Sequence, residues 1–248
     1  MSKATLSAKS VSKEPLLTIM VPVYNEGKTI LQILKAVTSL PIDNYEIIVI
    51  NDASADRSLA VIDKFKKSFK SSRVNLKIES HPKNRGKGAA IKTALKNASG
   101  TYFVIQDADL EYAPRDIPPL LEAVFKDDLD VVYGSRFLGS IKGMPKPNYY
   151  ANRFYNFMLR RLYKTKITDM HTCYKMVKTP LLKDLKMTSD GFDYASELVS
   201  KLLRRGINIR EVPISFTGRT KIEGKKIGYK DGIECIYKLI RYRFSNTI

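Results

Sequence analysis

The sequence predicts an α/β protein built on a mostly parallel β-sheet with helices on both faces. Three observations carry this prediction. Short apolar runs that suit strands alternate with segments that place apolar residues at helical spacing. Strand-like runs such as residues 16–24 are apolar on both faces, as in strands that are buried on both sides. A length of 248 residues with 44% hydrophobic residues suits one such domain with additions.

In the first half of the chain, each predicted strand is followed by a predicted helix. Leu16–Tyr24 is an apolar run rich in strand formers, and residues 25–40 then show helical spacing. The same alternation continues with predicted strands at 45–52, 74–80, 101–106 and 129–135 and predicted helices at 56–69, 88–97 and 116–125. Such alternation is typical of a parallel sheet covered on both sides.

The second half is less regular. We expect a helix at 150–163, a segment "TDMHTCYKMV" at 168–177, and a helix at 193–206 that stops at a C-terminal glycine. A strand at 207–216 and a basic loop at 217–228 precede a last, amphipathic helix. The predicted organisation is a disordered tail (1–15), one α/β domain (16–228) and a C-terminal helix (229–248).

The net charge of +18 is concentrated in the second half of the chain. Residues 136–186 contain 12 Lys or Arg against 2 Asp or Glu, which gives +10 for this stretch alone. Such asymmetry points to a polyanionic partner, either nucleic acid, an anionic membrane surface or phosphate groups. A solvated basic surface is the alternative.

Several classes of protein are excluded by composition. No run of about 18 apolar residues is present that would predict a transmembrane helix. The polar N-terminus lacks the apolar stretch of a secretory signal. Cys173 and Cys235 are too few for a disulfide framework, and with two histidines they do not predict a zinc site. These features favour a cytoplasmic protein.

Acidic residues gather where predicted strands end. Asp107 and Asp109 follow one strand, Asp52 follows another, and Glu26 follows the first. Ligands of parallel α/β sheets bind beyond the carboxyl ends of the strands. Carboxylates gathered at one edge repel each other unless a cation lies among them, so we expect Mg²⁺ or Mn²⁺ holding a diphosphate.

The glycine-rich stretch "NRGKGAA" (84–90) matches neither a P-loop nor GxGxxG. It predicts the start of a helix. Either the N-terminal N–H groups of that helix face a phosphate, or the glycines only turn the chain.

Seven motifs occur in order between Leu17 and Phe244: "VPVYNE", "NDASAD", "NRGKGAA", "DADLEY", "GSRF", "DMHTCYK" and "GRTKIEGKKIG". Together they resemble family 2 glycosyltransferases of the GT-A fold, and within them the dolichol- or polyprenyl-phosphate hexose synthases. The resemblance implies inverting transfer of a hexose from a nucleotide sugar, of the GDP-mannose or UDP-glucose type, to a dolichyl or polyprenyl phosphate. It also implies Mg²⁺ or Mn²⁺ as cofactor. "DMHTCYK" departs from the more usual DxTSGF.

The resemblance also implies roles for individual residues. Catalytic roles fall on Asp107, Asp109, Arg136 and Arg219, and metal binding on Asp109 with Asp107 and Glu111. Residues expected to bind the donor are Pro22, Tyr24, Glu26, Ile50, Asp52, Asp107, Ala108, Asp109, Arg219, Lys225 and Lys226. The acceptor phosphate is expected to contact Arg136, Arg153 and Asn156.

An acceptor phosphate is already ionised at neutral pH, so it needs orientation rather than a general base. If a base exists, Asp193 and Glu197 are the candidates, although a helix-capping or surface role is the favoured interpretation. Because no segment can span a bilayer, a lipid acceptor would be met from the cytoplasmic face of the membrane. Either the C-terminal helix binds anionic headgroups there, or a membrane-embedded partner subunit holds the protein.

Two other functions are considered. A GT-A enzyme can instead act on a soluble, protein or polysaccharide acceptor, because the donor half of the fold is shared. A basic nucleic-acid-binding module is the third interpretation. The sequence contains no motif of that kind, and the gathered carboxylates would repel a phosphate backbone, so we expect no nucleic acid partner.

Overall fold

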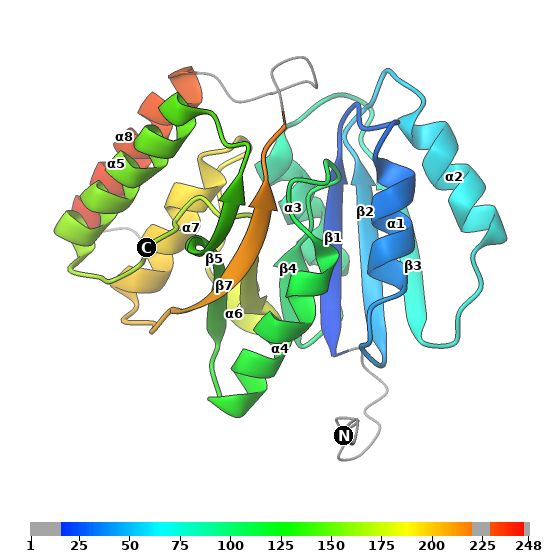
Figure 1. Ribbon diagram of the computed structural model, residues 1–248, viewed down its shortest axis with the longest axis horizontal. Helices are drawn as coiled ribbons and strands as arrows, with labels where there is room; N and C mark the ends of the chain where they lie inside the picture. The colour runs from blue at the N-terminus through cyan, green and yellow to red at the C-terminus, as the bar shows by residue number, and fades with distance from the viewer. Residues whose placement is uncertain (1–15, 220–228, 246–248) are drawn as a thin grey trace.

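Seven strands form one sheet in the computed structural model, which describes residues 16–219 and 229–245 (Figure 1). Their order is β3-β2-β1-β4-β6-β5-β7. The bounds are β1 Leu17–Val23, β2 Tyr45–Asn51, β3 Val74–Ser80, β4 Tyr102–Ile105, β5 Val131–Lys142, β6 Lys175–Lys178 and β7 Arg210–Thr217. β6 pairs antiparallel with β4 and β5, and the other neighbouring strands pair parallel. The predicted mostly parallel sheet is confirmed.

Helices cover both faces of this sheet. In Figure 1, α1 and α4 lie in front of the strands, whereas α3 and α6 lie behind them. The bounds are α1 Ile30–Thr38, α2 Ser58–Ser68, α3 Lys87–Asn97, α4 Ile117–Lys126, α5 Lys146–Tyr163, α6 Thr179–Asp184, α7 Tyr194–Arg204 and α8 Tyr229–Phe244, with a short 3-10 helix at Pro114–Asp116. The apolar residues at helical spacing in α1 are buried, namely Ile30, Ile33, Leu34 and Val37.

The registers of the parallel strands bring the predicted donor-side residues to one edge. β1 and β2 pair with Pro22 opposite Ile50 and Val23 opposite Asn51. β4 pairs with the other side of β1, and its last register pair is Met20 with Ile105. The segments that follow Val23, Asn51 and Ile105 therefore leave the same edge of the sheet.

Three local predictions differ from the structure. β5 does not end at residue 135, because it continues beside β7 to Lys142 after a register shift between Ser135 and Ser140. β6 and α6 were not predicted. β6 is only four residues long and begins with a buried lysine, Lys175, so it lacks the apolar pattern of a central strand. The predicted tail (1–15) lies outside the described residues, as does most of the 217–228 loop.

α5 and α8 lie side by side at the end of the sheet farthest from β3 (Figure 1). The Tyr163 hydroxyl of α5 donates to the Leu239 carbonyl of α8 at 2.8 Å. α8 has two apolar sides. Cys235, Leu239 and Tyr242 are buried, while Ile233, Tyr237, Ile240 and Phe244 are exposed. None of the described helices is long and apolar enough to cross a membrane.

Candidate active site

Carboxylates that follow β1 and β4 meet one arginine that follows β7. Arg219 Nη1 lies 3.1 Å from Glu26 Oε2, and Arg219 Nη2 lies 2.9 Å from Asp109 Oδ2. The backbone N–H of Arg219 donates to Glu111 Oε1 at 2.9 Å. The structure thus brings together four predicted site residues from three separate stretches of the chain. Lys225 and Lys226 lie outside the described residues.

Asp107 is bound by a lysine that the sequence analysis did not select. Lys87, in the first turn of α3, places its Nζ 2.5 Å from Asp107 Oδ1. Cys173 Sγ lies 4.0 Å from the same Nζ. Burial disfavours the charged form of Asp107, but Lys87 outweighs burial and lowers the pKa of that carboxyl. Asp107 is therefore an ionised carboxylate with one oxygen held by a partly buried ammonium group.

Asp109 has a different environment from Asp107. Burial, together with the negative charges of Asp107 and Glu111, raises the pKa of Asp109 to about 7, and Arg219 acts in the opposite direction. Among the described residues, no three metal-ligating side chains converge on one point. A protein-bound Mg²⁺ usually takes one or two carboxylates and completes its shell with phosphate oxygens. The surplus of negative charge around Asp109 fits such a cation, with Asp109 and Glu111 as the residues that would hold it.

The "NRGKGAA" segment binds a carboxylate of the protein itself. The backbone N–H groups of Arg85 and Gly86 donate to Asp52 at 2.9 and 2.8 Å, and His81 Nδ1 lies 2.7 Å from the same carboxylate. Of the two alternatives from the sequence, a phosphate-facing helix start is not what the geometry shows for these N–H groups. Asp52 is buried, and its predicted contact with the nucleotide remains a prediction.

Both glycines of that segment are required by a close approach of backbone. A Cβ atom on Gly86 would lie 2.5 Å from the Asp190 carbonyl oxygen, and one on Gly88 would lie 2.4 Å from the Ser189 carbonyl oxygen. Gly86 also has φ of +91°, which disfavours other residues. The segment 188–193 therefore packs directly on the start of α3, which carries Lys87.

The remaining predicted donor residues lie along the same edge. Ile50 and Ala108 are buried, Pro22 is half-buried, and Tyr24 presents an exposed ring. Pro22 and Ile50 are register partners, so the ends of β1 and β2 form one continuous surface beside Tyr24. Their roles in donor binding remain predictions.

On the acceptor side, Arg136 is not a free surface cation. Its Nε and Nη2 donate to Asp169 at 2.7 and 2.8 Å, and its backbone N–H donates to the same carboxylate at 3.0 Å. Nη2 also lies 3.4 Å from Asn152 Oδ1 of α5. Arg153, the next residue of α5, is exposed, with its guanidinium 5.9 Å from the ring centre of Tyr149.

Asn156 has a different role from the one predicted. Its side-chain N–H₂ donates to the Thr168 carbonyl at 2.5 Å, and its Oδ1 accepts from the Met170 N–H at 3.0 Å. The side chain is 2% exposed. Because both ends of the amide bind backbone, Asn156 anchors residues 168–170 instead of presenting a free group to a phosphate.

Neither candidate for a general base is free to act as one. Glu197 is fully buried and accepts the N–H groups of Thr188 and Ser189, and it lies 2.7 Å from Lys201 Nζ. Burial opposes ionisation, but these donors prevail and lower the pKa of Glu197 to about 2. The favoured surface role for Glu197 is therefore wrong. Asp193, at the N-cap position of α7, lies 3.4 Å from Lys238 Nζ of α8.

The sequence analysis missed two residues that hold the site together, Lys87 and Asp169. Lys87 was within a motif that had been analysed only for its glycines. Asp169 was quoted within "DMHTCYK", but nothing in the sequence paired it with Arg136, which lies 33 positions earlier. A buried Asp–Arg pair between distant segments has no local sequence signal.

A mostly parallel sheet with carboxylates and basic residues at the carboxyl ends of its strands defines an α/β protein with a ligand site at that edge. Residues 18–186 match the model of glycosyl transferase family 2, and the chain belongs to that family. The predicted membership and fold are thereby confirmed.

Two curated relatives resemble the chain along most of its length. It is 28% identical to a dolichol-phosphate mannosyltransferase of Pyrococcus furiosus over 237 residues, which cover 91% of this chain and 64% of that protein. It is 26% identical to the low-salt glycan biosynthesis hexosyltransferase Agl6 of Haloferax volcanii, covering 83% of this chain and 48% of that protein. The chain thus spans less than two thirds of the length of either relative.

A solved structure supports the fold. Glucosyl-3-phosphoglycerate synthase of Mycobacterium tuberculosis, in complex with Mn²⁺, UDP and phosphoglyceric acid, superimposes with a TM-score of 0.69. The match is 16% identical and covers 94% of this chain and 79% of the other.

Proposed function

We propose that this glycosyltransferase moves a hexosyl group, with inversion, from a nucleotide sugar to the phosphate of a dolichyl or polyprenyl phosphate. The similarity to a dolichol-phosphate mannosyltransferase supports this acceptor. The observation that carries the proposal is the set of basic and aromatic residues that α5 exposes beside Arg136. This helix contacts the buried Arg136 through Asn152. It exposes Arg153 and Phe154 directly after that contact, and Phe157 one turn further on.

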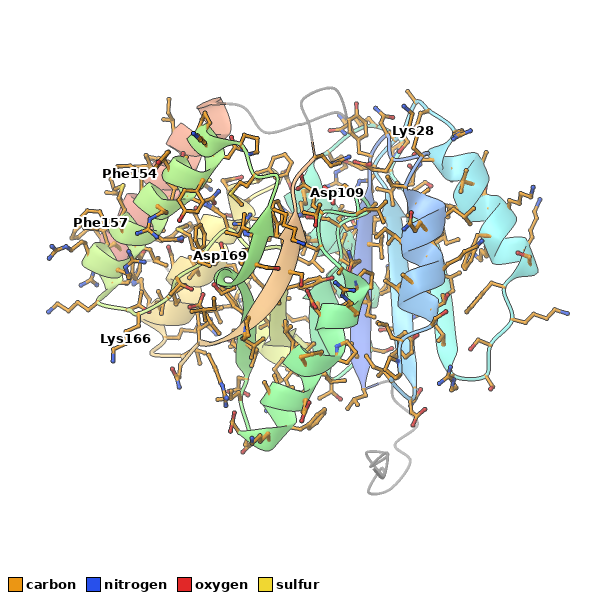
Figure 2. All side chains as sticks on the ribbon, viewed as in Figure 1. Lys28, Asp109, Phe154, Phe157, Lys166 and Asp169 are labelled. Carbon is orange, nitrogen blue, oxygen red and sulfur yellow. The ribbon has the colours of Figure 1, made fainter. Side chains whose placement is uncertain are left out.

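That arrangement suits an acceptor with an anionic head and an apolar tail. Phe154 is 52% exposed and Phe157 is 48% exposed, and Figure 2 shows both on the outer side of α5, away from the sheet. Exposed aromatic residues next to basic ones are typical of surfaces that meet lipid headgroups and the top of the acyl region. A soluble sugar acceptor would not need these rings.

On the donor side, the protein must stabilise the charge that grows on the departing nucleoside diphosphate. A divalent cation held by Asp109 and Glu111 would act there as a Lewis acid. Arg219 now binds Glu26 and Asp109, and the diphosphate would offer its guanidinium a stronger anionic partner. Lys87 keeps Asp107 ionised and fixed beside them. The phosphate of the acceptor carries its own negative charge, so Arg153 and Arg136 need only orient it.

The exposed side of α8 supports attachment to an anionic membrane surface at the cytoplasmic face. One side of α8 is buried against the protein, whereas the apolar residues of its other side are exposed and available to a membrane. The pairing of Lys238 with Asp193 removes Lys238 from the basic residues expected at headgroups, whereas Arg241 and Arg243 are exposed. Each basic residue near an anionic leaflet contributes about 1 kcal/mol. A membrane-embedded partner subunit is the alternative means of attachment.

The acceptor is tested by incubating the protein with Mn²⁺, polyprenyl phosphate and either radiolabelled GDP-mannose or UDP-glucose, followed by organic extraction. We expect label in the organic phase with one of these donors. Label transferred only to a soluble, protein or polysaccharide acceptor would overturn the lipid proposal and leave the family assignment intact.

The membrane surface is tested by sedimentation with vesicles. Changing Arg241 and Arg243 to Gln should weaken binding to anionic vesicles by about tenfold, since two such residues contribute about 2 kcal/mol at most. Changing Lys64 and Lys67, exposed residues of α2, to Gln alters the net charge equally and is the matched control. Equal loss in both variants would show that only net charge matters, and no loss in either would point to the partner subunit.

A further inference from the structure

The geometry points to Asp169 as a positioning residue for the acceptor phosphate: it fixes the guanidinium of Arg136 so that only Nη1 faces the incoming phosphate. This inference rests on the proposed function, in which Arg136 helps to orient the acceptor. Asp169 contacts no predicted substrate position itself, and it acts through Arg136.

Arg136 and Asp169 form a buried ion pair with several hydrogen bonds. Asp169 is fully buried, Arg136 is 6% exposed, and three N–H groups of Arg136 are directed to this one carboxylate. Three rings, Tyr112, Phe137 and Phe216, lie within 5.2 to 6.0 Å of the guanidinium carbon. An arginine held by two side-chain hydrogen bonds and surrounded by rings has a fixed plane and cannot swing toward a ligand.

The N–H donors of Arg136 that remain for a ligand lie on Nη1. Nε and Nη2 of Arg136 are used by Asp169, and Nη2 also lies beside Asn152. Within the described part of the chain, Nη1 makes no hydrogen bond in the structure. A phosphate oxygen can therefore be received at Nη1, on a guanidinium whose direction is set in advance. A guanidinium that is already oriented loses less conformational entropy when it binds a ligand in a reactive geometry.

The backbone around Asp169 is itself held by two other elements of the fold. Glu211 of β7 accepts the N–H groups of Thr168 and Asp169 at 2.8 and 2.9 Å. Asn156 of α5 binds the backbone of Thr168 and Met170. Figure 2 shows Asp169 on the side of Asp109 that faces α5. The segment 168–170 is thus fixed by a strand and by the helix that carries Arg153.

The same contacts argue against a second role for Asp169, that of a general base. Both of its carboxylate oxygens accept hydrogen bonds from Arg136, and the side chain is fully buried. A base must come within hydrogen-bond distance of the proton that it removes. Asp169 cannot do so without releasing Arg136.

The experiment compares Asp169→Asn with Glu211→Gln. Each change removes one carboxylate charge at the segment 168–170, but only the first alters the contact with Arg136, since Glu211 binds Thr168 and the Asp169 backbone. The probe is farnesyl phosphate, titrated by calorimetry in the presence of Mn²⁺ and UDP or GDP, so that binding is measured without turnover. We expect Asp169→Asn to weaken its binding at least about tenfold, the effect of losing one charge-assisted contact. Glu211→Gln should change it less than about twofold, because glutamine keeps one accepting oxygen and Asn156 still binds Thr168 and Met170 on either side of Asp169.

Nucleotide affinity and thermal midpoint are measured on the same samples. Unchanged nucleotide affinity shows that a variant is folded, and Glu211→Gln is expected to lower the thermal midpoint without affecting the probe. In a protein that already carries Arg136→Met, Asp169→Asn should weaken farnesyl phosphate binding no further, because its effect passes through Arg136. Restoring a carboxylate with Asp169→Glu should recover part of the affinity.

Equal weakening by Asp169→Asn and Glu211→Gln, a further loss in the Arg136→Met background, or no binding of farnesyl phosphate to the native protein would each overturn the inference. The proposed function fails differently. A protein that shows the expected binding pattern but transfers no sugar to polyprenyl phosphate would support the role of Asp169 and exclude the lipid transferase.

Discussion

Replacing Arg219 by methionine should make the free protein bind a divalent cation more tightly. In the structure, Arg219 lies 3.1 Å from Glu26 Oε2 and 2.9 Å from Asp109 Oδ2. Its guanidinium therefore competes with a cation for the carboxylate that the cation needs. Methionine keeps much of the side-chain volume and removes the competing charge.

The size of the effect follows from the ion pair with Asp109, because Glu26 is not one of the residues that would hold the cation. The side chain of Arg219 is 18% exposed, so this pair is partly screened by water. A charge pair of this kind contributes about 1 kcal/mol. Because about 1.4 kcal/mol corresponds to tenfold, Mn²⁺ should bind the variant about fivefold more tightly. With donor present, by contrast, we expect the same variant to be impaired. The lost contact to the departing diphosphate should lower kcat roughly ten- to a hundredfold.

The assay is calorimetric titration of Mn²⁺ into the protein without nucleotide, followed by steady-state kinetics with donor and acceptor. Arg205→Met is the matched control, because Arg205 pairs with Asp184 at 2.5 Å, outside the group of residues around Asp109. Unchanged or weaker Mn²⁺ binding in Arg219→Met would refute the competition. A change confined to KM for the donor would refute the role in the transition state.

The other predictions concern the carboxylates. Asp109→Ala should abolish transfer, as should excess chelator with the native protein, whereas Glu111→Gln should retain activity within about threefold because its amide oxygen can still accept the Arg219 N–H. A dead Glu111→Gln variant would mean that its charge is required. Glu197→Gln should lower the free energy of unfolding at pH 7 by roughly 3 kcal/mol, since the pKa of Glu197 is lowered from 4.5 to about 2 by the fold. A lowered carboxyl pKa contributes stability above about pH 4.5 that is lost toward pH 2, so the difference in urea denaturation should shrink over that range, and a constant difference would contradict the assignment.

The sequence predicted the fold where periodicity is strong and failed where it is weak. β1 and β2 are mostly apolar, and both are fully or almost fully buried. β6 contributes four residues, of which Lys175 is buried with its Nζ 5.2 Å from the ring centre of Tyr133. A lysine in a central strand reads as a loop residue, because its long-range partners are not visible in the sequence.

The candidate site was predictable in its residue types and less so in its pairings. Asp109, Glu111 and Arg219, which the resemblance assigns to one site, lie in contact across more than a hundred residues, and their roles remain predictions. The partners of Asp107 and Arg136 were not predicted, because ion pairs between distant segments depend on packing that no local pattern records. The two apolar sides of α8 show a related limit. Helical spacing identifies apolar residues on a side of the helix, but it does not predict whether that side packs on the protein or is exposed.

The contacts of the segment 188–193 with α8 and α3 link two equilibria that are usually measured separately, membrane attachment and donor binding. The segment 188–193 touches α8 through Lys238 with Asp193 and through Tyr242 with Thr188, and it packs on the start of α3, whose Lys87 holds Asp107. If attachment at the outer side of α8 shifts this segment, it also changes the free energy of donor binding. Such coupling is reciprocal. A protein that holds its donor more tightly on a membrane must, by the same free energy, hold the membrane more tightly once the donor is bound.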